Sequence, residues 1–391
     1  MRIAVFTKKT TLHEGFAGLE TQNKALVEGL AAKNYDVTVF SPKWSLSTNQ
    51  AEENGVKYVF VDCVYRMGPI FGFFGTFQKS NWINRSAEEF EKAHIKEKFD
   101  LVLAQSSSGL GVIKRKKEFD VPVISISHGT IIGEYTTFIK SVKFPQDLTL
   151  LIKNTGFVIK NFFRRQREFV HKSDKVICVS NAVKNSLIEE TFAPEKKFTV
   201  IHNGIVPFEV GDIKRGKKAL YVGRIDKTKG LDDIAEIFPG LDYEVDIVGG
   251  GDYLKEFKSK VKKYGNIHVL GKMTYEEVLK NYFSSPEYGV FVFPTKRFEG
   301  FPMVLVEAMF AGLPIVAYDM GGVSDAVRDN ETGFLVKKED KVQFKSKLIG
   351  LLEDEVLRNQ FSRNAMKIAE ENYTIDVMLS KYIEIIKKVA R

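Results

Sequence analysis

The sequence predicts an α/β protein built from two doubly wound domains, and three observations support this prediction. The length of 391 residues corresponds to two or three domains of roughly 150 residues each. Short apolar segments alternate with helix-like segments along the whole chain, as expected for parallel sheets that are covered on both faces. A stretch at 205–218, with Pro207, Gly211 and a basic cluster, separates two halves that both follow this alternation.

The first half contains β-branched and aromatic runs that are apolar at consecutive positions, which is typical of buried parallel strands. A helix is expected at 19–32, where Leu19, Ala25, Leu26 and Leu30 recur with helical spacing. Strands are expected at 3–7, 36–40, 56–61, 101–104, 121–126 and 176–179.

The second half repeats the pattern and ends in a helix expected at 375–389. Because ligands of open α/β sheets bind beyond the carboxyl ends of the strands, functional residues should directly follow each strand. In this half, strands are expected at 219–222, 245–248, 267–270, 290–293 and 315–317.

The net charge of +8 is confined to the first half of the chain. Residues 1–205 hold 29 Lys and Arg against 21 Asp and Glu, whereas residues 206–391 hold 29 of each. Within the first half, residues 138–175 hold nine basic and three acidic residues. Such an excess indicates nucleic acid, a membrane surface or an anionic substrate as partner. No nucleic-acid recognition motif occurs, so we expect no nucleic-acid partner.

Other features of the sequence exclude several classes of protein. Cys63 and Cys178 lie outside any Cys-x-x-Cys or Cys/His cluster, so we expect neither a disulfide scaffold nor a structural zinc site. The apolar run at 3–6 is too short for a signal peptide, and no stretch of about 18 apolar residues could span a membrane. We therefore expect a cytoplasmic protein.

The loop and helix after the strand at 290–293 carry the strongest functional signal. A glycine loop leads into a helix expected to begin near Pro302 or Met303, so free backbone N–H groups face the ligand. Glu299 in the loop and Glu307 on the helix supply two carboxylates, which suit several sugar hydroxyls. The structural alternative is a solvated loop with an ordinary surface glutamate.

The segment 221–230 follows the first strand of the second half and is the second signal. Gly223 lets the backbone pass close to a ligand, and Arg224 and Lys229 are both cationic. A planar guanidinium and a mobile ammonium together suit a diphosphate. The structural alternative is a solvated basic loop.

Glycine turns follow two further strands of this half. Gly249 and Gly250 would allow close approach of a nucleotide, and Gly271, Lys272 and Met273 could hold a nucleobase through their backbone. Each turn taken alone is also consistent with a purely structural role.

The first half offers weaker candidates. Gly18 opens a helix after the first strand, a place where an anion can bind. His128 follows the strand at 121–126 and is either a substrate contact or a hydrogen-bonded structural residue. The turn at 202–205 is expected to form a hinge. No Asp-x-Asp pair occurs, so a metal ion that bridges a diphosphate has no evident ligands, and we expect no cofactor.

On these motifs the chain resembles the retaining GT-B glycosyltransferases of family 4, also called glycosyl transferases group 1, over nearly its whole length. The matching segments are AGLETQ at 17–22, SHG at 127–129, VSNAV at 179–183, HNGI at 202–205, VGRIDKTKG at 222–230, GGGD at 249–252, the Glu-x7-Glu segment at 299–307, GLPIVAYDMGG at 312–322 and TGFLV at 332–336. Two loops depart from the family pattern: Ala17-Gly18 replaces Gly-Gly, and 321–325 lacks the usual Pro-Glu.

The resemblance implies a GT-B fold of two Rossmann-like domains that face a central cleft. Residues 1–205 would bind the acceptor and 206–372 the nucleotide sugar, and 373–391 would cross back onto the first domain. It also implies that Arg224 and Lys229 bind the donor diphosphate. The implied catalytic residues are Glu299, His128, Lys229 and Arg224, and the implied donor-binding residues are Gly18, Gly223, Arg224, Lys229, Gly249, Gly250, Gly271, Lys272, Met273, Glu299, Gly300, Phe301, Pro302, Met303, Val304 and Glu307, of which Glu307 holds the ribose.

The expected activity is therefore a metal-independent, retaining transfer of a hexose or N-acetylhexosamine from a nucleoside diphosphate sugar. A UDP-sugar is favoured, with GDP-mannose next, and the acceptor is the hydroxyl of a lipid-linked or cell-surface glycan. The alternatives are a sugar-nucleotide epimerase or phosphorylase of similar shape, and a non-catalytic basic protein that binds membrane surfaces.

Residues 138–175 bear on the acceptor because they interleave cations with apolar side chains. Such a segment can lie on an anionic membrane, which would place the protein peripherally on the cytoplasmic face. An aromatic cluster of Phe71, Phe73, Phe74, Phe77 and Trp82 lies nearby in the sequence. The structural alternative is a pair of helices with their apolar side in the core.

Overall fold

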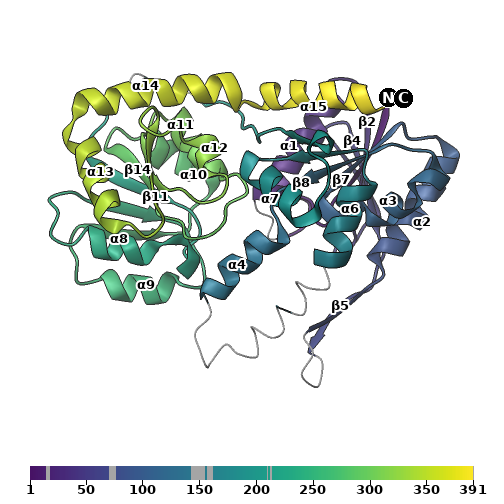
Figure 1. Ribbon diagram of the computed structural model, residues 1–391, viewed down its shortest axis with the longest axis horizontal. Helices are drawn as coiled ribbons and strands as arrows, with labels where there is room; N and C mark the ends of the chain where they lie inside the picture. Colours follow the sequence, from purple (N-terminus) through teal and green to yellow (C-terminus); the bar gives the residue numbers. More distant parts are fainter. Residues whose placement is uncertain are drawn as a thin grey trace. The chain divides into compact units, whose positions relative to one another are not determined.

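The computed structural model describes residues 1–14, 18–69, 76–141, 155, 162–208, 210–211 and 214–390. The chain forms two compact units (Figure 1), one made of Met1–Gly204 with Ile375–Arg391 and the other of Ile205–Thr374. Both units contain a sheet of mainly parallel strands, so the predicted pair of parallel α/β domains is confirmed.

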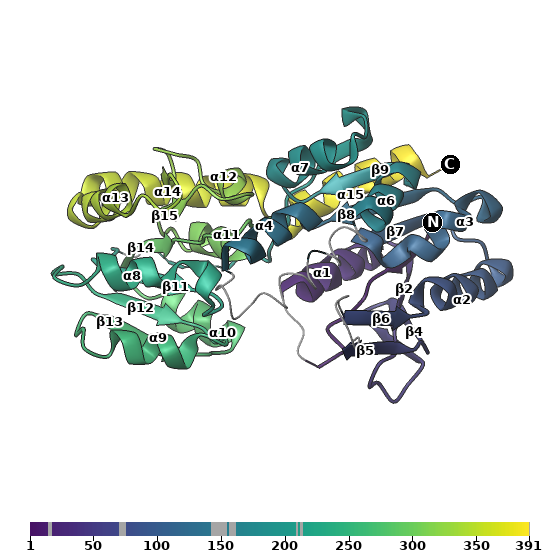
Figure 2. The ribbon, with the colours of Figure 1, turned by 60° about the horizontal axis from the view of Figure 1, so that its bottom comes forward.

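The first unit contains an eight-stranded sheet in the order β10-β9-β8-β7-β1-β2-β4-β3, in which only the β3–β4 pair is antiparallel. A separate hairpin, β5–β6, forms a two-stranded sheet (Figure 2). The strands are β1 (Arg2–Phe6), β2 (Asp36–Pro42), β3 (Gln50–Glu53), β4 (Val56–Val61), β5 (Tyr65–Pro69), β6 (Thr76–Ser80), β7 (Leu101–Gln105), β8 (Val123–Ser127), β9 (Lys175–Cys178) and β10 (Phe198–Val200).

Helices cover both faces of this sheet because successive residues of each strand point to opposite sides. Val5 of β1 belongs to a core with Leu26 of α1, whereas the adjacent Phe6 packs against Phe40 and against Phe90 of α2. The helices of this unit are α1 (Gly18–Ala32), α2 (Trp82–Lys96), α3 (Leu110–Phe119), α4 (Ile131–Ser141), α6 (Arg167–Lys172), α7 (Asn181–Thr191) and α15 (Ile375–Val389).

The last helix, α15, packs on α1 in the first unit. Leu379 lies so close to Gly29 that a Cβ on this glycine would be 2.3 Å from the leucine Cδ1. Where the chain enters and leaves the second unit, the two segments lie side by side, because the Ile205 N–H donates to the Tyr373 carbonyl at 2.9 Å. One backbone hydrogen bond therefore joins the two segments that connect the units.

The second unit contains a six-stranded, fully parallel sheet in the order β13-β12-β11-β14-β15-β16. Tyr221, Ile247 and Val292 face a core shared with α8, α9 and α13. The strands are β11 (Lys218–Val222), β12 (Val245–Val248), β13 (Ile267–Gly271), β14 (Tyr288–Phe293), β15 (Ile315–Tyr318) and β16 (Gly333–Val336), and the helices are α8 (Leu231–Ile237), α9 (Leu254–Val261), α10 (Tyr275–Val278), α11 (Met303–Phe310), α12 (Val323–Ala326), α13 (Lys341–Glu353) and α14 (Glu355–Asn372).

Some strands have no counterpart among those predicted. Edge strand β3 has the sequence Gln-Ala-Glu-Glu, and its side chains are exposed or half-buried, so no apolar pattern marks it. The strand predicted at 121–126 is β8, which begins only at Val123. Pro122 before it lacks the backbone N–H that a central strand needs.

None of the helices in the described part of the chain is long and apolar enough to cross a membrane.

Candidate functional site

The carboxyl edge of the second sheet brings the cationic loop and the glutamate loop together. Nζ of Lys229, after β11, lies 2.6 Å from Oε1 of Glu299, after β14, and the side chains are only 12% and 13% exposed. Thr295 donates a second hydrogen bond to the same carboxylate oxygen at 2.9 Å. The ammonium also lies 5.6 Å from the centre of the Phe293 ring. Two residues 70 positions apart thus form one charged, largely desolvated pair at the edge where ligands of such sheets bind.

A buried network holds these two loops in place. The Lys296 ammonium lies 2.7 Å from Oδ1 of Asp233, which is nearly completely buried on α8. The hydroxyl of Tyr318 donates to the other oxygen of Asp233 at 2.8 Å. The Lys296 backbone N–H donates to the carbonyl of Thr228 at 2.8 Å, next to Lys229. No local sequence pattern marks this network, because Asp233 is an ordinary-looking acidic residue in the first turn of a helix.

Glycines allow the loops at this edge to touch through their backbones. Gly249 has φ of 149°, and a Cβ there would lie 1.8 Å from the carbonyl oxygen of Gly223. Gly321 has φ of 62°, and a Cβ there would lie 2.4 Å from the carbonyl oxygen of Glu299. That same oxygen accepts the N–H of Gly322 at 2.7 Å. Gly321 is therefore needed for the backbone contact that holds Glu299 beside the strand ends, and Gly249 for the contact between the loops after β12 and β11.

Glu307 is half-buried on helix α11, and burial raises its pKa to about 7. The pKa of Tyr275, at the start of α10, is raised mainly by burial and further by the charge of Glu307. A carboxyl group in this environment binds hydroxyl groups strongly once it is ionised, because few water molecules compete for it. Its ionisation at neutral pH is costly unless a ligand supplies donors.

The remaining predicted donor-binding residues of the second unit differ in how far their side chains are exposed to solvent. Arg224 is 66% exposed and lies 3.7 Å from Asp226, so its guanidinium points into solvent rather than into the buried pair. Lys272 is exposed and Met273 half-buried beyond β13. Gly250 lies beside Lys272, because a Cβ there would be 3.2 Å from the Lys272 Cβ.

The start of helix α11 agrees with the predicted position, since it begins at Met303 with Pro302 before it. The Phe301 ring is buried against Tyr373, with ring centres 5.5 Å apart. Gly300 and Val304 are half-buried. The Phe301 side chain therefore anchors the loop, which leaves only its backbone for ligand contact.

In the first unit, a buried amide chain positions His128. Its Nε2 lies 2.6 Å from Oε1 of Gln105, and Nε2 of Gln105 donates to Oδ1 of Asn23 at 2.7 Å. Because the amide oxygen accepts, Nε2 of His128 carries the proton. Burial lowers the pKa of His128 to about 4, so the ring is neutral at physiological pH.

Gly18, the predicted anion-binding glycine, is the first residue of α1. A Cβ at this position would meet no atom within 4 Å, so packing does not require a glycine there.

The segment predicted to contact a membrane is only partly described. Of residues 138–175, the stretches 142–154 and 156–161 lie outside the described residues, as do Phe71, Phe73 and Phe74. Trp82 is part of the protein interior, where its Nε1 donates to the Ser108 carbonyl at 2.8 Å. The aromatic cluster expected from the sequence therefore does not include Trp82 as a surface residue.

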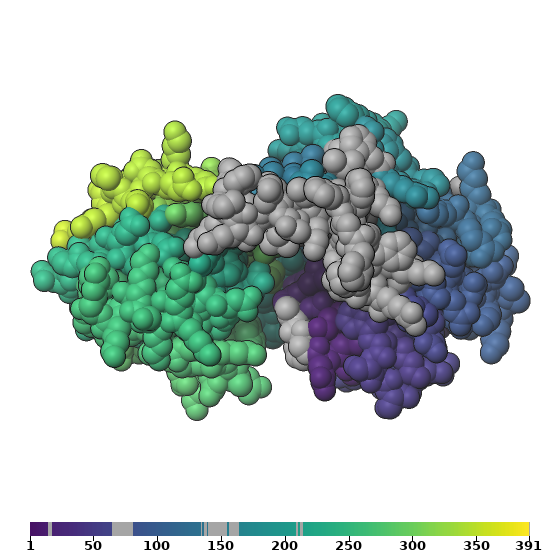
Figure 3. Space-filling view, turned by 90° about the horizontal axis from the view of Figure 1, so that it is seen from below, coloured from purple at the N-terminus to yellow at the C-terminus, as the bar shows by residue number. Residues whose placement is uncertain are grey.

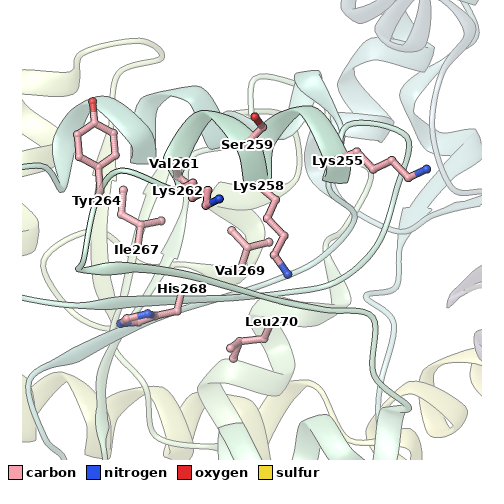
Figure 4. Close-up of a pocket in the computed structure, with 10 residues that line it drawn as sticks. All are labelled: Lys255, Lys258, Ser259, Val261, Lys262, Tyr264, Ile267, His268, Val269 and Leu270. Carbon is pink, nitrogen blue, oxygen red and sulfur yellow. The ribbon is translucent and has the colours of Figure 1, made fainter.

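A basic groove lies between α9 and edge strand β13 (Figure 4). Figure 3 shows the surface from the side on which α8 and α9 lie. The groove is lined by Lys255, Lys258, Ser259, Val261, Lys262, Tyr264, Ile267, His268, Val269 and Leu270. Within the described part of the chain, no group of three or more His, Cys, Asp or Glu residues could hold a metal ion.

Comparison with known proteins agrees with a fold of two parallel-sheet units. Residues 207–368 match the family model of glycosyl transferases group 1, and residues 16–207 match the model of glycosyltransferase family 4. The family models and the fold define a glycosyltransferase of the GT-B type. The chain belongs to the family 4 glycosyltransferases.

Two relatives illustrate the range of this similarity. An uncharacterised glycosyltransferase of Methanocaldococcus jannaschii is 26% identical over 95% of both chains. A capsular polysaccharide biosynthesis glycosyltransferase of Staphylococcus aureus is 30% identical over 52% of this chain. The alignment with this second relative spans 58% of its length, and another M. jannaschii relative is matched over 64% of its length.

Solved structures share the fold at low sequence identity. Sucrose-phosphate synthase from Thermosynechococcus elongatus superposes with a TM-score of 0.74 at 18% identity, covering 99% of this chain and 98% of the other. The Anabaena protein HepE, solved in complex with UDP and glucose, superposes with a TM-score of 0.70 at 15% identity, covering 99% of this chain and 100% of the other. These likenesses establish the GT-B fold for this chain.

Proposed function

We propose that this glycosyltransferase transfers a sugar, with retention of configuration, from a nucleoside diphosphate sugar to a hydroxyl of a lipid-linked or cell-surface glycan. The observation that carries the proposal is the Lys229–Glu299 pair at the carboxyl edge of the second sheet. A UDP-sugar is the favoured donor and GDP-mannose the next. The Anabaena neighbour solved with UDP and glucose supports this choice.

In the proposed reaction, Lys229 and Arg224 stabilise the negative charge that develops on the leaving diphosphate. Lys229 is already placed and desolvated, whereas the exposed Arg224 is free to turn toward the phosphates. Contact with the diphosphate weakens the Lys229–Glu299 bond, and Glu299 then accepts hydrogen bonds from sugar hydroxyls. The leaving diphosphate itself takes the proton of the acceptor hydroxyl on the same face of the sugar. These cations supply the charge stabilisation without a metal cofactor.

A thermal-shift panel of UDP- and GDP-sugars, measured with and without EDTA, tests the donor. We expect the cognate nucleotide sugar to raise the melting temperature, because a ligand at about 100 times its Kd stabilises the fold by roughly 2.7 kcal/mol. The same donor should be consumed when acceptor glycans are added. A shift that disappears with EDTA would contradict metal independence, and the absence of any shift across the panel would contradict the proposed donor class.

We further propose that the acceptor is reached at the cytoplasmic face of a membrane, where the basic residues of 138–175 contact anionic lipid. Flotation with vesicles that contain phosphatidylglycerol should carry the protein upward at low salt. Binding should weaken as salt rises, since the attraction is screened within a Debye length of about 10 Å at 0.1 M salt. Protein that stays at the bottom of the gradient at low salt would refute the membrane contact.

A further inference from the structure

Trp44 is an exposed indole in an unfavourable backbone conformation. Its φ is 45°, and 44% of its surface is accessible. It is the second residue of a tight turn in which the Leu46 N–H donates to the Lys43 carbonyl at 3.0 Å. Turns with a positive φ at this place favour Gly, Asn or Asp, and a bulky residue there is an outlier. A large aromatic side chain at such a position suggests a role for the indole itself.

His13 packs against this indole. The buried His13 accepts the Thr10 N–H at Nδ1 (3.1 Å), and its Nε2 donates to the carbonyl of Pro42 at 2.9 Å. Its ring centre lies 5.3 Å from that of Trp44, at an interplanar angle of 65°. The loop after β1 is thus tied to the end of β2, and the exposed indole rests on a rigid support.

The position of Trp44 matches the place where an acceptor would lie. Strands β8, β7, β1 and β2 are neighbours and run parallel, so Trp44 after β2 and His128 after β8 lie at the same edge of the sheet. Three strand spacings of about 4.8 Å separate these ends by roughly 14 Å. This distance corresponds to a short oligosaccharide, whose sugar rings each present an apolar C–H face that packs on an aromatic ring.

We infer that Trp44 is a binding platform for a sugar ring of the acceptor, set back from the ring that receives the new sugar. This inference rests on the proposed function and specifies a saccharide subsite within it. An indole that instead anchors the protein in a bilayer is the competing outcome, and the experiment below separates the two.

Tryptophan fluorescence tests the platform directly, because the chain has only two tryptophans and Trp82 is buried. Acrylamide quenches the exposed Trp44 selectively. We expect a panel of neutral hexose and N-acetylhexosamine oligosaccharides to include members that protect Trp44 from acrylamide at millimolar concentration. Protection by phosphatidylcholine–phosphatidylglycerol vesicles and by none of the glycans would overturn the proposal, and so would no protection by either.

Kinetics of three variants provide the second measurement. Trp44→Ala and Trp44→Gly should each raise KM for the glycan acceptor about tenfold, as for a lost aromatic contact. KM for the donor should stay unchanged in both. Glycine adopts the positive φ without strain, so the glycine variant should melt at a higher temperature than the alanine variant. A raised acceptor KM in the glycine variant therefore cannot be attributed to a folding defect.

Phe192→Ala is the matched control. Phe192 is also exposed, with φ of 55°, but it ends helix α7 just before β10 begins, at the opposite edge of the sheet. Its removal should leave KM for the acceptor unchanged. An acceptor KM that is normal in Trp44→Gly would refute the subsite. The thermal shift caused by nucleotide sugars reports on donor binding in the second unit and does not involve Trp44. It therefore tests the proposed function separately from the saccharide subsite.

Discussion

Replacing Lys229 with alanine is expected to lower kcat by at least about a hundredfold, which corresponds to roughly 3 kcal/mol of lost transition-state stabilisation. Glu299, 2.6 Å away, holds the ammonium at the sheet edge before the donor binds, so only a small shift brings it to the diphosphate. Glu299→Ala should cause a loss of similar size, because it removes the group that places Lys229 and that we propose contacts the donor sugar.

Lys227→Ala is the matched control for this loss. Lys227 lies two residues away in the same loop, but its ammonium is 3.0 Å from Glu256 on α9, and both side chains are largely exposed. Steady-state kinetics should show almost unchanged kcat for Lys227→Ala. Thermal melting of all variants verifies folding, since removing one partner of a desolvated pair leaves the other charge uncompensated. Near-normal turnover in a well-folded Lys229→Ala protein would refute the assigned role.

Replacing Glu307 with glutamine is expected to weaken nucleotide binding about tenfold to a hundredfold while it stabilises the free protein above pH 7. The loss of affinity follows because hydrogen bonds to a charged acceptor contribute about 1.5–3 kcal/mol. Burial raises the pKa of Glu307 from about 4.5 to about 7. Between these pH values, the folded state keeps a proton that the unfolded state has lost.

The free energy of unfolding therefore falls as pH rises through this window and stays lower above pH 7. Glutamine removes this cost, so the variant should melt a few degrees higher than the wild type at pH 8 and show little difference near pH 4. Nucleotide affinity of the wild type should decrease below about pH 7, where the carboxyl is protonated in the free protein. Isothermal titration and thermal melting across this range measure both effects.

The exposed Glu276 on α10 gives a matched control in the same unit. Glu276→Gln should change neither the affinity nor the dependence of the melting temperature on pH. If the melting temperature of Glu307→Gln followed the wild type at every pH, the raised pKa of Glu307 would be refuted. If its nucleotide affinity were also unchanged, Glu307 would have no part in the site.

Much of the fold could be predicted because parallel strands buried on both faces are apolar at consecutive positions. Strands β4 and β12 were predicted with the bounds that the structure shows. Edge strand β3 was missed because its side chains are polar and exposed, and only backbone pairing with β4 defines it. Local patterns reveal burial, and an edge strand with little burial leaves no pattern.

The candidate site was predicted less completely. The sequence indicated Lys229 and Glu299 because they lie in loops that follow strands, and Glu307 because it lies on the helix that the Glu299 loop opens. Asp233 and Gln105 were not indicated, since their importance depends on partners 63 and 23 residues away. Trp44 likewise stands out only through its backbone angle and its contact with His13.

The sequence by itself determined the class of fold, its two halves and the loops that carry the charged residues, because periodicity and glycine placement are local properties. Only the tertiary structure decided which charges meet. It placed Lys229 against Glu299 and left Arg224 in solvent, although both cations lie in one basic loop. It also raised the pKa of Glu307 and lowered that of His128 by burial. Desolvation and pairing depend on residues far apart in the chain, so no local pattern could reveal them.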